Sequence, residues 1–429
     1  MAFELWHGLL LASAALLGVL FLLVLAEPGL RYTVNEMPPQ PGSHELLGLI
    51  AALADAPVGN ATGIEVIPDG EGFYQAMLES IMQARRTVHL EAYIFRRSRI
   101  ADRFLSTLAE RAKAGVRVRI VVDAIGCWNT PDRYFAALRA AGGEVAWYQP
   151  VRWYTLKRFN NRTHRELLVV DGLEAFVGGA GIASWWDQPQ AGLPPWRDTM
   201  VRLQGPVVSS LQAVFAENWL ESAGELLADA GSFPDCRALA PSAASGRQAI
   251  VVAGTPSAGK ATRARMLFQL AIASARRSVL IQSPYFLPDR SMRSELQRAT
   301  SRGVSVRVLV PGRHNNHPIA RRASRRRYGM LLEAGVEIAE YQPGMNHTKL
   351  LVIDDGLAVV GTSNFDNRSF GLNDEVNVVL VDAEAVQALV QGFHQHWAAS
   401  LAIQMADWRA RPMLERALAL LGIVLERQQ

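Results

Sequence analysis

The sequence predicts an α/β protein made of two similar halves. Three short segments of the first part recur in the same order in the second part, which indicates an internal duplication. Strand-like and helix-like segments alternate in both parts, so each half is expected to form a mixed sheet flanked by helices. The repeated segments are 84–88 and 275–279, 115–119 and 303–307, and 141–150 and 334–343.

The chain length fits this division. Its 429 residues exceed what a single hydrophobic core usually organises. The expected boundaries are 63–235 for the first half and 249–429 for the second half, which ends in a C-terminal helix. The stretch 236–248, rich in Ser, Ala and Pro, is expected to link the two halves.

The N-terminus predicts a membrane anchor. Residues 8–26 contain no charged side chain and are long enough to cross a bilayer as a helix. We therefore expect an N-terminal transmembrane helix within 1–35, followed by a Pro-rich linker over 36–62. No Lys or Arg precedes the apolar run, which argues against a signal peptide. Arg31 follows it, and the positive-inside rule then favours a cytoplasmic body.

The composition restricts the function less strongly. The two cysteines, Cys127 and Cys236, do not make a disulfide framework, and they suit a reducing compartment. The formal net charge of +4 fits anionic partners such as phospholipids or nucleic acid, but solubility alone also explains it.

The second half carries the more complete site motif. His347 and Lys349 precede a short apolar run, and on a strand they point to the same face. An ammonium group holds a phosphoryl oxygen, and an imidazole attacks phosphorus or carries a proton near neutral pH. Asp354 ends the run. Ser363 and Asn364 follow a glycine turn and are expected to add neutral hydrogen-bond donors.

The first half repeats this motif with two replacements. His164 and Asp171 lie 183 positions before the histidine and the aspartate of the second half. Glu166 stands where the lysine is expected, and Gly181 stands in place of the asparagine. A carboxylate beside a phosphodiester is repulsive, so either Glu166 meets an arginine or another cation, or this half has lost its grip on phosphate. A role in binding or deprotonating an acceptor hydroxyl is a further alternative.

One acidic residue follows each histidine strand in a polar setting. A nucleophilic histidine needs an acceptor on its far nitrogen, which fixes the tautomer and supports the positive ring. Asp198, in a Trp-Arg-Asp segment, and Glu375, in an Asn-Asp-Glu segment, fit that role. The alternative for each is a solvent-facing acidic turn.

The spacing His-x-Lys-x-x-x-x-Asp followed by Gly-x-x-Asn resembles the HKD signature of the phospholipase D superfamily. The segments 194–198, 282–289 and 361–377 resemble the Trp-Arg-Asp, Pro-Tyr-Phe and Gly-Thr-x-Asn segments of bacterial cardiolipin synthases. The resemblance extends from Val66 to the C-terminus and implies two phospholipase D-like halves that share one active site at their interface.

The resemblance also implies a function. We expect a membrane-bound phosphatidyltransferase that makes cardiolipin or a related phospholipid through a phosphohistidine intermediate. One histidine, expected to be His164, attacks phosphorus, and the other protonates the leaving alcohol and deprotonates the incoming one. Lys349, Asn364 and Ser363 are expected to hold the phosphoryl oxygens. The expected catalytic set is His164, His347, Lys349, Asp171, Asp354, Asp198 and Glu375.

The implied surroundings are those of a lipid enzyme. No metal or other cofactor is expected. The expected partners are phosphatidylglycerol or a similar phospholipid, a glycerol-type acceptor and the bacterial inner membrane, which the chain would cross once; no nucleic acid is expected. Two stretches suit a lipid surface: 147–158 interleaves aromatic residues with cations, and 321–328 is strongly basic. A packed loop and a solvated face are the respective alternatives.

Two other functions remain open from the sequence. Water as the acceptor would make the protein a phospholipase D-type phosphodiesterase or a nuclease. Replacement of half of the phosphate-binding residues, by Glu166 and Gly181, would also suit a catalytically impaired relative that binds lipid.

Overall fold

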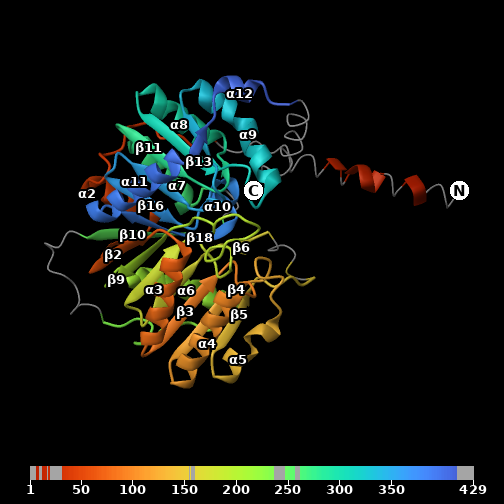
Figure 1. Cartoon of the computed structure of the whole chain (residues 1–429), viewed down its shortest axis with the longest axis vertical. Coiled ribbons are helices and arrows are strands. Elements are labelled where there is room, and N and C mark those ends of the chain that lie inside the picture. Colours follow the sequence, from red (N-terminus) through yellow and green to blue (C-terminus); the bar gives the residue numbers. More distant parts are fainter. Residues whose placement is uncertain are drawn as a thin grey trace.

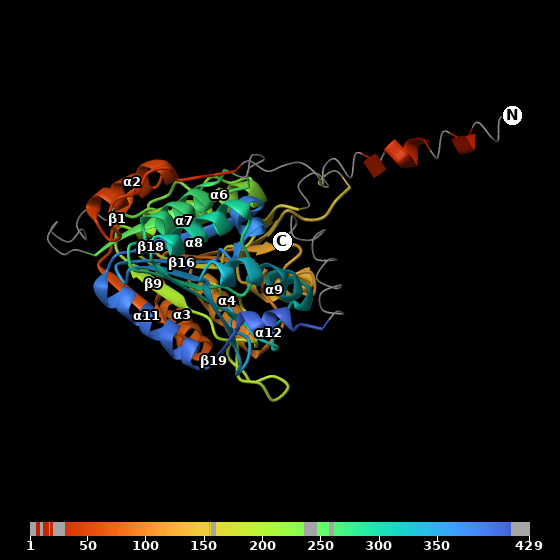
Figure 2. The same cartoon turned by 90° about the horizontal axis from the view of Figure 1, so that it is seen from above.

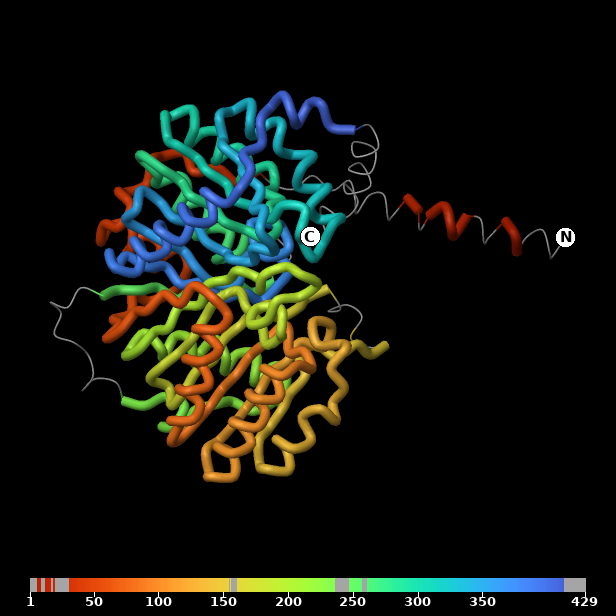
Figure 3. Tube along the Cα trace, in the orientation of Figure 1, coloured from red at the N-terminus to blue at the C-terminus, as the bar shows by residue number. Residues whose placement is uncertain are grey.

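The computed structural model describes residues 6–8, 12–16, 18–19, 31–153, 155, 160–235, 247–256 and 261–412. These residues form two α/β halves, each built on a mixed sheet, which lie one above the other along the long axis of the molecule (Figure 1). The Cα trace passes from the lower half, in orange to yellow-green, to the upper half, in green to blue (Figure 3). The duplicated α/β fold expected from the sequence is therefore confirmed.

The first half has a seven-stranded sheet in the order β2-β9-β8-β7-β3-β4-β5. The pairs β3–β4 and β4–β5 are parallel, and the other pairs are antiparallel. Its strands are β2 (Gly63–Ile67), β3 (Thr87–Ala92), β4 (Arg117–Asp123), β5 (Glu144–Tyr148), β7 (Leu167–Val170), β8 (Glu174–Gly178) and β9 (Met200–Gln204). Its helices are α3 (Gly70–Gln83), α4 (Arg99–Lys113), the 3-10 helix η1 (Asp132–Phe135), α5 (Ala136–Ala140) and α6 (Val208–Ala223).

The second half has a larger sheet in the order β1-β10-β18-β16-β15-β11-β13-β14-β19, and β6 of the first half pairs with β18. Its strands are β10 (Gln248–Gly254), β11 (Ser278–Gln282), β13 (Ser305–Pro311), β14 (Glu337–Tyr341), β15 (Leu350–Ile353), β16 (Leu357–Gly361), β18 (Asn373–Leu380) and β19 (Ser400–Ala402), with β6 spanning Arg162–Thr163. A small separate sheet pairs β12 (Phe286–Leu287) with β17 (Phe365–Asp366). Its helices are α7 (Arg263–Ser274), α8 (Arg290–Ser301), α9 (Pro318–Glu333), α10 (Asn367–Gly371), α11 (Ala383–Ala398) and α12 (Met405–Arg409).

Two strands in the centre of the sheets, β7 and β15, position the site. All four residues of each strand are apolar and buried, and their side chains alternate between two cores. Leu350 and Val352 face a core that both halves share around α6 and α11, whereas Leu351 and Ile353 face the outer core of the second half. Side chains just before each strand are thereby expected to alternate between the same two sides.

The segment 36–62, expected to be a linker, contains two elements of the folded body. Helix α2 (His44–Ala54) begins at Ser43, whose side chain accepts from the N–H of Leu46, and packs apolar residues against α7. Strand β1 (Val58–Asn60) then pairs with β10 of the second half. The Pro-rich start of this segment suggested a spacer, but the short apolar pattern after it folds onto the second core.

Most of the expected transmembrane segment lies outside the described residues, as does most of the expected C-terminal helix, over 413–429. Among the residues that the structure describes, no helix is long and apolar enough to cross a membrane. The described residues between 6 and 19 lie apart from the two halves in both views (Figures 1 and 2).

Candidate active site

Each histidine lies on a segment whose backbone is hydrogen-bonded to the other half. The N–H of His164 donates to the carbonyl oxygen of Asp374 over 2.8 Å, next to the parallel pairing of β6 with β18. In the matching position, the N–H of His347 donates to the carbonyl oxygen of Arg197 over 2.6 Å. The two histidine segments are therefore held at the interface between the halves.

The two acidic residues hold the histidines in a crossed arrangement. The Nδ1 atom of His164 lies 3.1 Å from a carboxylate oxygen of Glu375, which belongs to the second half. The Nδ1 atom of His347 lies 2.8 Å from a carboxylate oxygen of Asp198, which belongs to the first half. A carboxylate on Nδ1 leaves Nε2 as the reacting nitrogen of each ring. Neither histidine–carboxylate pair can form within one half.

Strand register shows that the two carboxylates occupy equivalent places. Gly178 of β8 pairs with Met200 of β9, and Gly361 of β16 pairs with Asn377 of β18. The two glycines are equivalent in the repeat, and each carboxylate lies two residues before the partner of its glycine. The sequence predicted the comparable placement but did not predict that each carboxylate serves the other half.

His347 is the more enclosed of the two histidines. Its side chain is buried and packs against the rings of Trp186 and Trp196, with centroids 5.6 and 5.7 Å away. Burial and then the adjacent charge of Lys349 lower the pKa of His347 to about 4, against the opposing effect of Asp198. The ring is therefore neutral at pH 7 in the free protein.

Glu375 is the ionised partner of the less enclosed histidine. Burial alone would raise the pKa of Glu375, but its contacts with His164 and Thr362 hold that pKa below the ordinary value. An ionised carboxylate on Nδ1 of His164 keeps the proton on that nitrogen, so the lone pair of Nε2 points away from Glu375.

Lys349 lies beside the second-half histidine. Its Nζ atom is 2.8 Å from the carbonyl oxygen of His347, and it lies 2.8 Å from Nδ1 and 3.2 Å from Nε2 of the same ring. Burial lowers the pKa of Lys349 to about 8, and the negative charges around it, that of Asp198 first, act against this change. The ammonium group is therefore still mostly charged at pH 7 and is available to a phosphoryl oxygen.

Two neutral side chains lie near this end of the second-half sheet. Asn364 is buried, and its carboxamide oxygen has no hydrogen-bond partner among the described residues. The hydroxyl oxygen of Ser363 accepts from the side chain of Asn377 over 2.8 Å. A hydroxyl that accepts one hydrogen bond still has its own O–H to donate. Both side chains therefore retain hydrogen-bonding capacity for a ligand.

Glu166 occupies the first-half position that corresponds to the lysine. Its side chain is buried, and its carboxyl group accepts from the N–H of Ile94 over 3.1 Å. Burial raises the pKa of Glu166 well above its ordinary value, although the charge of Lys349 opposes this. A Cβ atom at Gly181 would lie only 2.8 Å from a carboxyl oxygen of Glu166. It would also lie 2.5 Å from the carbonyl oxygen of Ile94, so the neighbouring backbone by itself requires a glycine at this position.

Arg162 and Arg165, the arginines nearest to Glu166 in the sequence, pair with other carboxylates. The guanidinium group of Arg165 is buried and donates to Glu217 over 2.7 Å. Arg162 lies 3.6 Å from Asp123. Burial therefore favours the neutral form of Glu166, and neither of these arginines pairs with it.

The two aspartates of the motif lie away from the histidines. Asp171 and Asp354 follow β7 and β15, seven residues and roughly 20 Å of extended chain beyond each histidine. Each accepts hydrogen bonds from three consecutive backbone N–H groups, and both have a positive φ, of 54° and 52°. The structure thus places them in turns that tie the strand ends together, and not with the other predicted catalytic residues.

Three residues around the site were not predicted from the sequence. The Nε1–H of Trp186 donates to Asp198 over 3.2 Å, and the ring of Trp196 stacks on the ring of Trp185. Thr362 donates to Glu375 over 2.5 Å. The position of Thr362 next to the expected phosphate-binding residues was a usable signal, whereas Trp186 gave none. Among the described residues, no group of three or more His, Cys, Asp or Glu side chains is placed to hold a metal ion.

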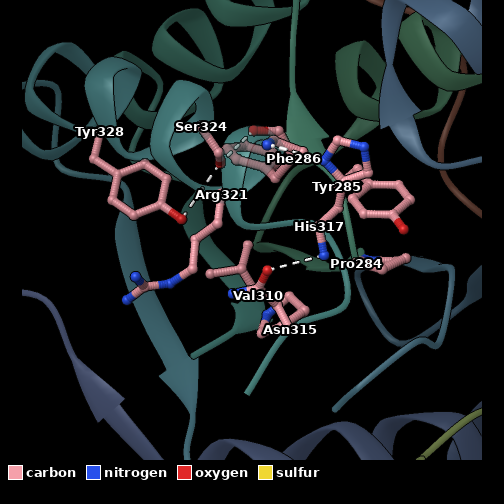
Figure 4. Close-up of a pocket in the computed structure, with 11 residues that line it drawn as sticks. Pro284, Tyr285, Phe286, Val310, Asn315, His317, Arg321, Ser324 and Tyr328 are labelled. Carbon is pink, nitrogen blue, oxygen red and sulfur yellow. Dashed lines mark hydrogen bonds between the residues drawn. The ribbon is translucent and has the colours of Figure 1, made fainter. Parts of the chain in front are cut away.

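The basic run 321–328 is largely part of the fold. Arg321 and Arg325 both form ion pairs with Glu340, at 2.7 and 2.5 Å. Tyr328 is buried on the same helix, α9, next to a pocket of about 10 Å³ that also contacts Tyr285 (Figure 4). Two arginines of this run therefore stabilise the helix instead of standing free for headgroups.

Comparison with known proteins agrees with this site. The family model described as "Cardiolipin synthase, PLD-like domain" matches residues 77–188 and 269–397, more than half of the chain. The chain belongs to this family. A cardiolipin synthase from Geobacillus kaustophilus (strain HTA426) is 35% identical over 397 residues, which cover 92% of this chain and 78% of that protein. One from Geobacillus thermodenitrificans (strain NG80-2) is 34% identical over the same lengths.

Solved structures show the same fold at low sequence identity. Phosphatidylserine synthase from Haemophilus influenzae Rd KW20 has a TM-score of 0.68 and 12% identity, and the match covers 90% of this chain and all of that chain. Polyphosphate kinase from Porphyromonas gingivalis has a TM-score of 0.53 and 12% identity, over 91% of this chain and 57% of that chain. The predicted resemblance to the cardiolipin synthases of the phospholipase D superfamily is confirmed.

Proposed function

We propose that this protein transfers a phosphatidyl group from one phospholipid to the hydroxyl group of a second, glycerol-bearing lipid, as a cardiolipin synthase does. The observation that carries this proposal is the pair of crossed histidine–carboxylate contacts around the charged Lys349. Two imidazoles and one ammonium group at the junction of two repeats suit in-line exchange at a phosphodiester. We retain 63–235 and 249–429 as the two units that build this single site.

The first step cleaves the donor lipid. Nε2 of His164 attacks phosphorus, a P–N bond forms, and the bond from phosphorus to the headgroup oxygen breaks. From its protonated form, which is a minor fraction of the free protein at pH 7, His347 gives a proton to the departing oxygen, so that a neutral alcohol leaves. In the second step His347 takes the proton of the incoming hydroxyl, whose oxygen forms the new P–O bond as the P–N bond breaks. Both histidines then return to their starting states.

The choice of His164 as the nucleophile rests on its surroundings. Its side chain is 13% exposed, against 6% for His347, and its Nδ1 faces the ionised Glu375. An acceptor on Nδ1 raises the electron density at Nε2 and supports the positive charge that a P–N bond creates.

The residues that bind the phosphoryl oxygens in this proposal come from the second half. The ammonium group of Lys349 and the side-chain N–H of Asn364, both from the second half, donate to the non-bridging oxygens as charge develops on them. Glu166 remains neutral and therefore does not repel the phosphodiester, which removes the electrostatic objection to activity. The first half thus supplies a histidine and a carboxylate, and the second half supplies the same pair plus the cation.

The setting that we propose is the bacterial inner membrane, with the N-terminal segment as a single anchor and the body on the cytoplasmic side. The loop near residue 150 projects on the side from which the described N-terminal residues extend (Figures 2 and 3). Trp153 in this loop is 84% exposed, and exposed tryptophans favour the headgroup region. By contrast, Trp147 donates to Asp132 over 2.8 Å and belongs to the fold.

The deciding experiment uses the full-length protein in mixed micelles. Phosphatidylglycerol is supplied with or without glycerol or phosphatidylethanolamine, and the products are followed by mass spectrometry beside a His347→Ala variant. We expect a diphosphatidyl product that is lost in the variant. Phosphatidic acid as the sole His347-dependent product would show hydrolysis instead, and no His347-dependent product would show a lipid-binding protein without this activity.

A further inference from the structure

A second cavity lies behind the catalytic strand, at the interface of the two halves. It has a volume of about 340 Å³. Side chains alternate along an extended strand, so Thr348 faces this cavity while its neighbours His347 and Lys349 face the active site. The lining residues are Val66, Pro68, Asp69, Arg197, Thr199, Gln282, Tyr341, Thr348, Leu350, Ala388, Leu389, Gly392, Phe393, Gln395 and His396.

The equivalent place in the first half is filled by one side chain. Arg165 corresponds to Thr348 in the repeat, and its guanidinium group is buried. It donates to the carbonyl oxygen of Val214 over 2.8 Å and to Glu217 over 2.7 Å, and lies 3.7 Å from Asp374. The first half therefore closes this space with a buried ion-pair network.

The partners of Arg165 have counterparts that line the cavity. The ring pair Phe215–Trp219 stacks at 6.0 Å in α6, and Phe393–Trp397 stacks at 5.7 Å in the same place in α11. This match makes Val214 equivalent to Gly392, and Glu217 equivalent to Gln395, in the repeat. The equivalent pairs, first half then second, are Arg165 and Thr348, Val214 and Gly392, Glu217 and Gln395, and, from the strand register, Asp374 and Arg197.

The exchange of these residues leaves a positive charge where the first half has a negative one. Arg197 lines the cavity and is exposed to solvent, and no side-chain hydrogen bond or ion pair joins it to the other described residues. Thr348 is 2% exposed, and its Oγ1 atom has no hydrogen-bond partner there. The one carboxylate in the lining, Asp69, accepts from the N–H of Gly72 at the start of α3. His396 adds a neutral ring, because burial and then Arg197 lower its pKa to about 4.

We propose that this cavity binds a small anionic phosphate ester, with Arg197 pairing with the phosphate and Thr348 donating or accepting one hydrogen bond. Gln395 and the side-chain oxygen of Gln282, whose Nε2 donates to Asn346, suit the hydroxyl groups of a glycerol-type moiety. A guanidinium group recognises phosphate through paired N–H donors. The same chemistry is offered by a free glycerol phosphate and by the headgroup of an anionic lipid.

Such a ligand would contact the sequence neighbours of Asp198 and His347 on the side opposite to the reacting phosphate. Arg197 directly precedes Asp198 and accepts from the N–H of His347 through its carbonyl oxygen. Thr348 directly follows His347. Occupancy of the cavity therefore fixes the residues on both sides of the crossed contact, which makes it a positioning site distinct from the one that holds the reacting phosphate.

The test measures binding, so it does not depend on the proposed transferase activity. Full-length protein in detergent is titrated by calorimetry with inorganic phosphate, glycerol 3-phosphate and, separately, nanodiscs that contain phosphatidylglycerol. A Lys349→Met background weakens the active-site grip. We expect glycerol 3-phosphate to bind in that background, and Arg197→Gln to weaken binding about ten- to a hundredfold. Binding of nanodiscs alone, lost in the same way, would identify a lipid headgroup as the source.

Matched variants separate a lost site from a damaged fold. Thr348→Arg with Arg197→Asp rebuilds the first-half ion pair and should abolish binding while the melting temperature is maintained or raised. Arg322→Gln, on the exposed side of α9, should leave binding unchanged. Loss of all binding in Lys349→Met, or unchanged binding in the rebuilt double variant, would overturn the proposal.

Discussion

The two halves of this protein use the same strand positions for different purposes. On the side of the interface that carries the histidines, the second half has Lys349. The first half has Glu166 there, next to Gly181, and burial favours its neutral form. At the back, the first half buries Arg165 in an ion-pair network, whereas the second half leaves a cavity beside Thr348. The histidine–carboxylate contacts are crossed, so neither half can lose its pair without disabling the other. The lysine and asparagine proposed to bind the phosphoryl oxygens occur in the second half only.

The largest expected effect tests the division of labour between the two histidines. With phosphatidylglycerol as the donor, His164→Ala and His347→Ala should each lose activity by on the order of 10³-fold or more. With a phosphatidyl p-nitrophenyl ester, whose leaving group needs no proton, His347→Ala should still release p-nitrophenol in a burst, and His164→Ala should not. The burst is measured by absorbance, and the trapped phosphatidyl adduct by mass spectrometry of peptides.

Wild-type protein and the double histidine variant are the controls for that experiment. A burst in His164→Ala, with the adduct on His347, would reverse the two roles. The crossed geometry would then still hold, but the more enclosed histidine would be the nucleophile.

The next effect compares the two residues at the lysine position. Lys349→Met removes the charge that holds the phosphoryl oxygens and should lower kcat/KM about 10²- to 10³-fold. Glu166→Gln replaces a neutral carboxyl group by a neutral amide of the same shape, so kcat/KM should change less than about threefold. Steady-state kinetics on micelles check both. A loss in Glu166→Gln comparable to that in Lys349→Met would mean that Glu166 acts as an ionised base.

The sequence predicted most of the fold because the duplication is visible in it. The repeated segments and the buried strands before Asp171 and Asp354 predict two equivalent halves, and the structure has them. Helix α2 was missed because its apolar residues follow a Pro-rich stretch that suggested a spacer. Its stability comes from packing against α7, a tertiary contact that local sequence does not reveal.

The site was predictable in its residues but not in its connections. Spacing identified both histidines and the acidic residues that follow them. It did not show that Glu375 holds His164 while Asp198 holds His347, because that contact depends on how the halves pack. The fate of Glu166 was equally undetermined, since an arginine in the sequence gives no information about whether its side chain is already paired.

A third prediction uses the asymmetric surroundings of the histidines. Burial and Lys349 hold the pKa of His347 near 4, so its protonated fraction at pH 7 is small and rises about tenfold for each unit that the pH falls. If His347 protonates the leaving alcohol, kcat/KM for phosphatidylglycerol should increase as the pH falls from about 7.5 to about 5.5, a range that lies above the pKa of His347. The p-nitrophenyl ester should show little of this increase. A decrease towards acid pH with both substrates would contradict this acid role of His347, because it would show that the rate depends only on an unprotonated nucleophile.

The smallest expected effect on activity concerns the motif aspartates, of which Asp354 is the more buried. Asp354→Ala removes the acceptor of three backbone N–H groups and places an alanine at a φ of 52°, so it should lower the free energy of unfolding by about 2–3 kcal/mol. Asp171→Ala, in a more exposed turn, should cost less, and Asp354→Asn should recover part of the loss because asparagine tolerates that φ and keeps one oxygen. Denaturant unfolding and kcat/KM are measured on the same preparations. Since roughly 20 Å of strand separates these turns from the histidines, the folded variants should keep kcat/KM within about threefold. A selective loss of activity without loss of stability would return the aspartates to the catalytic set.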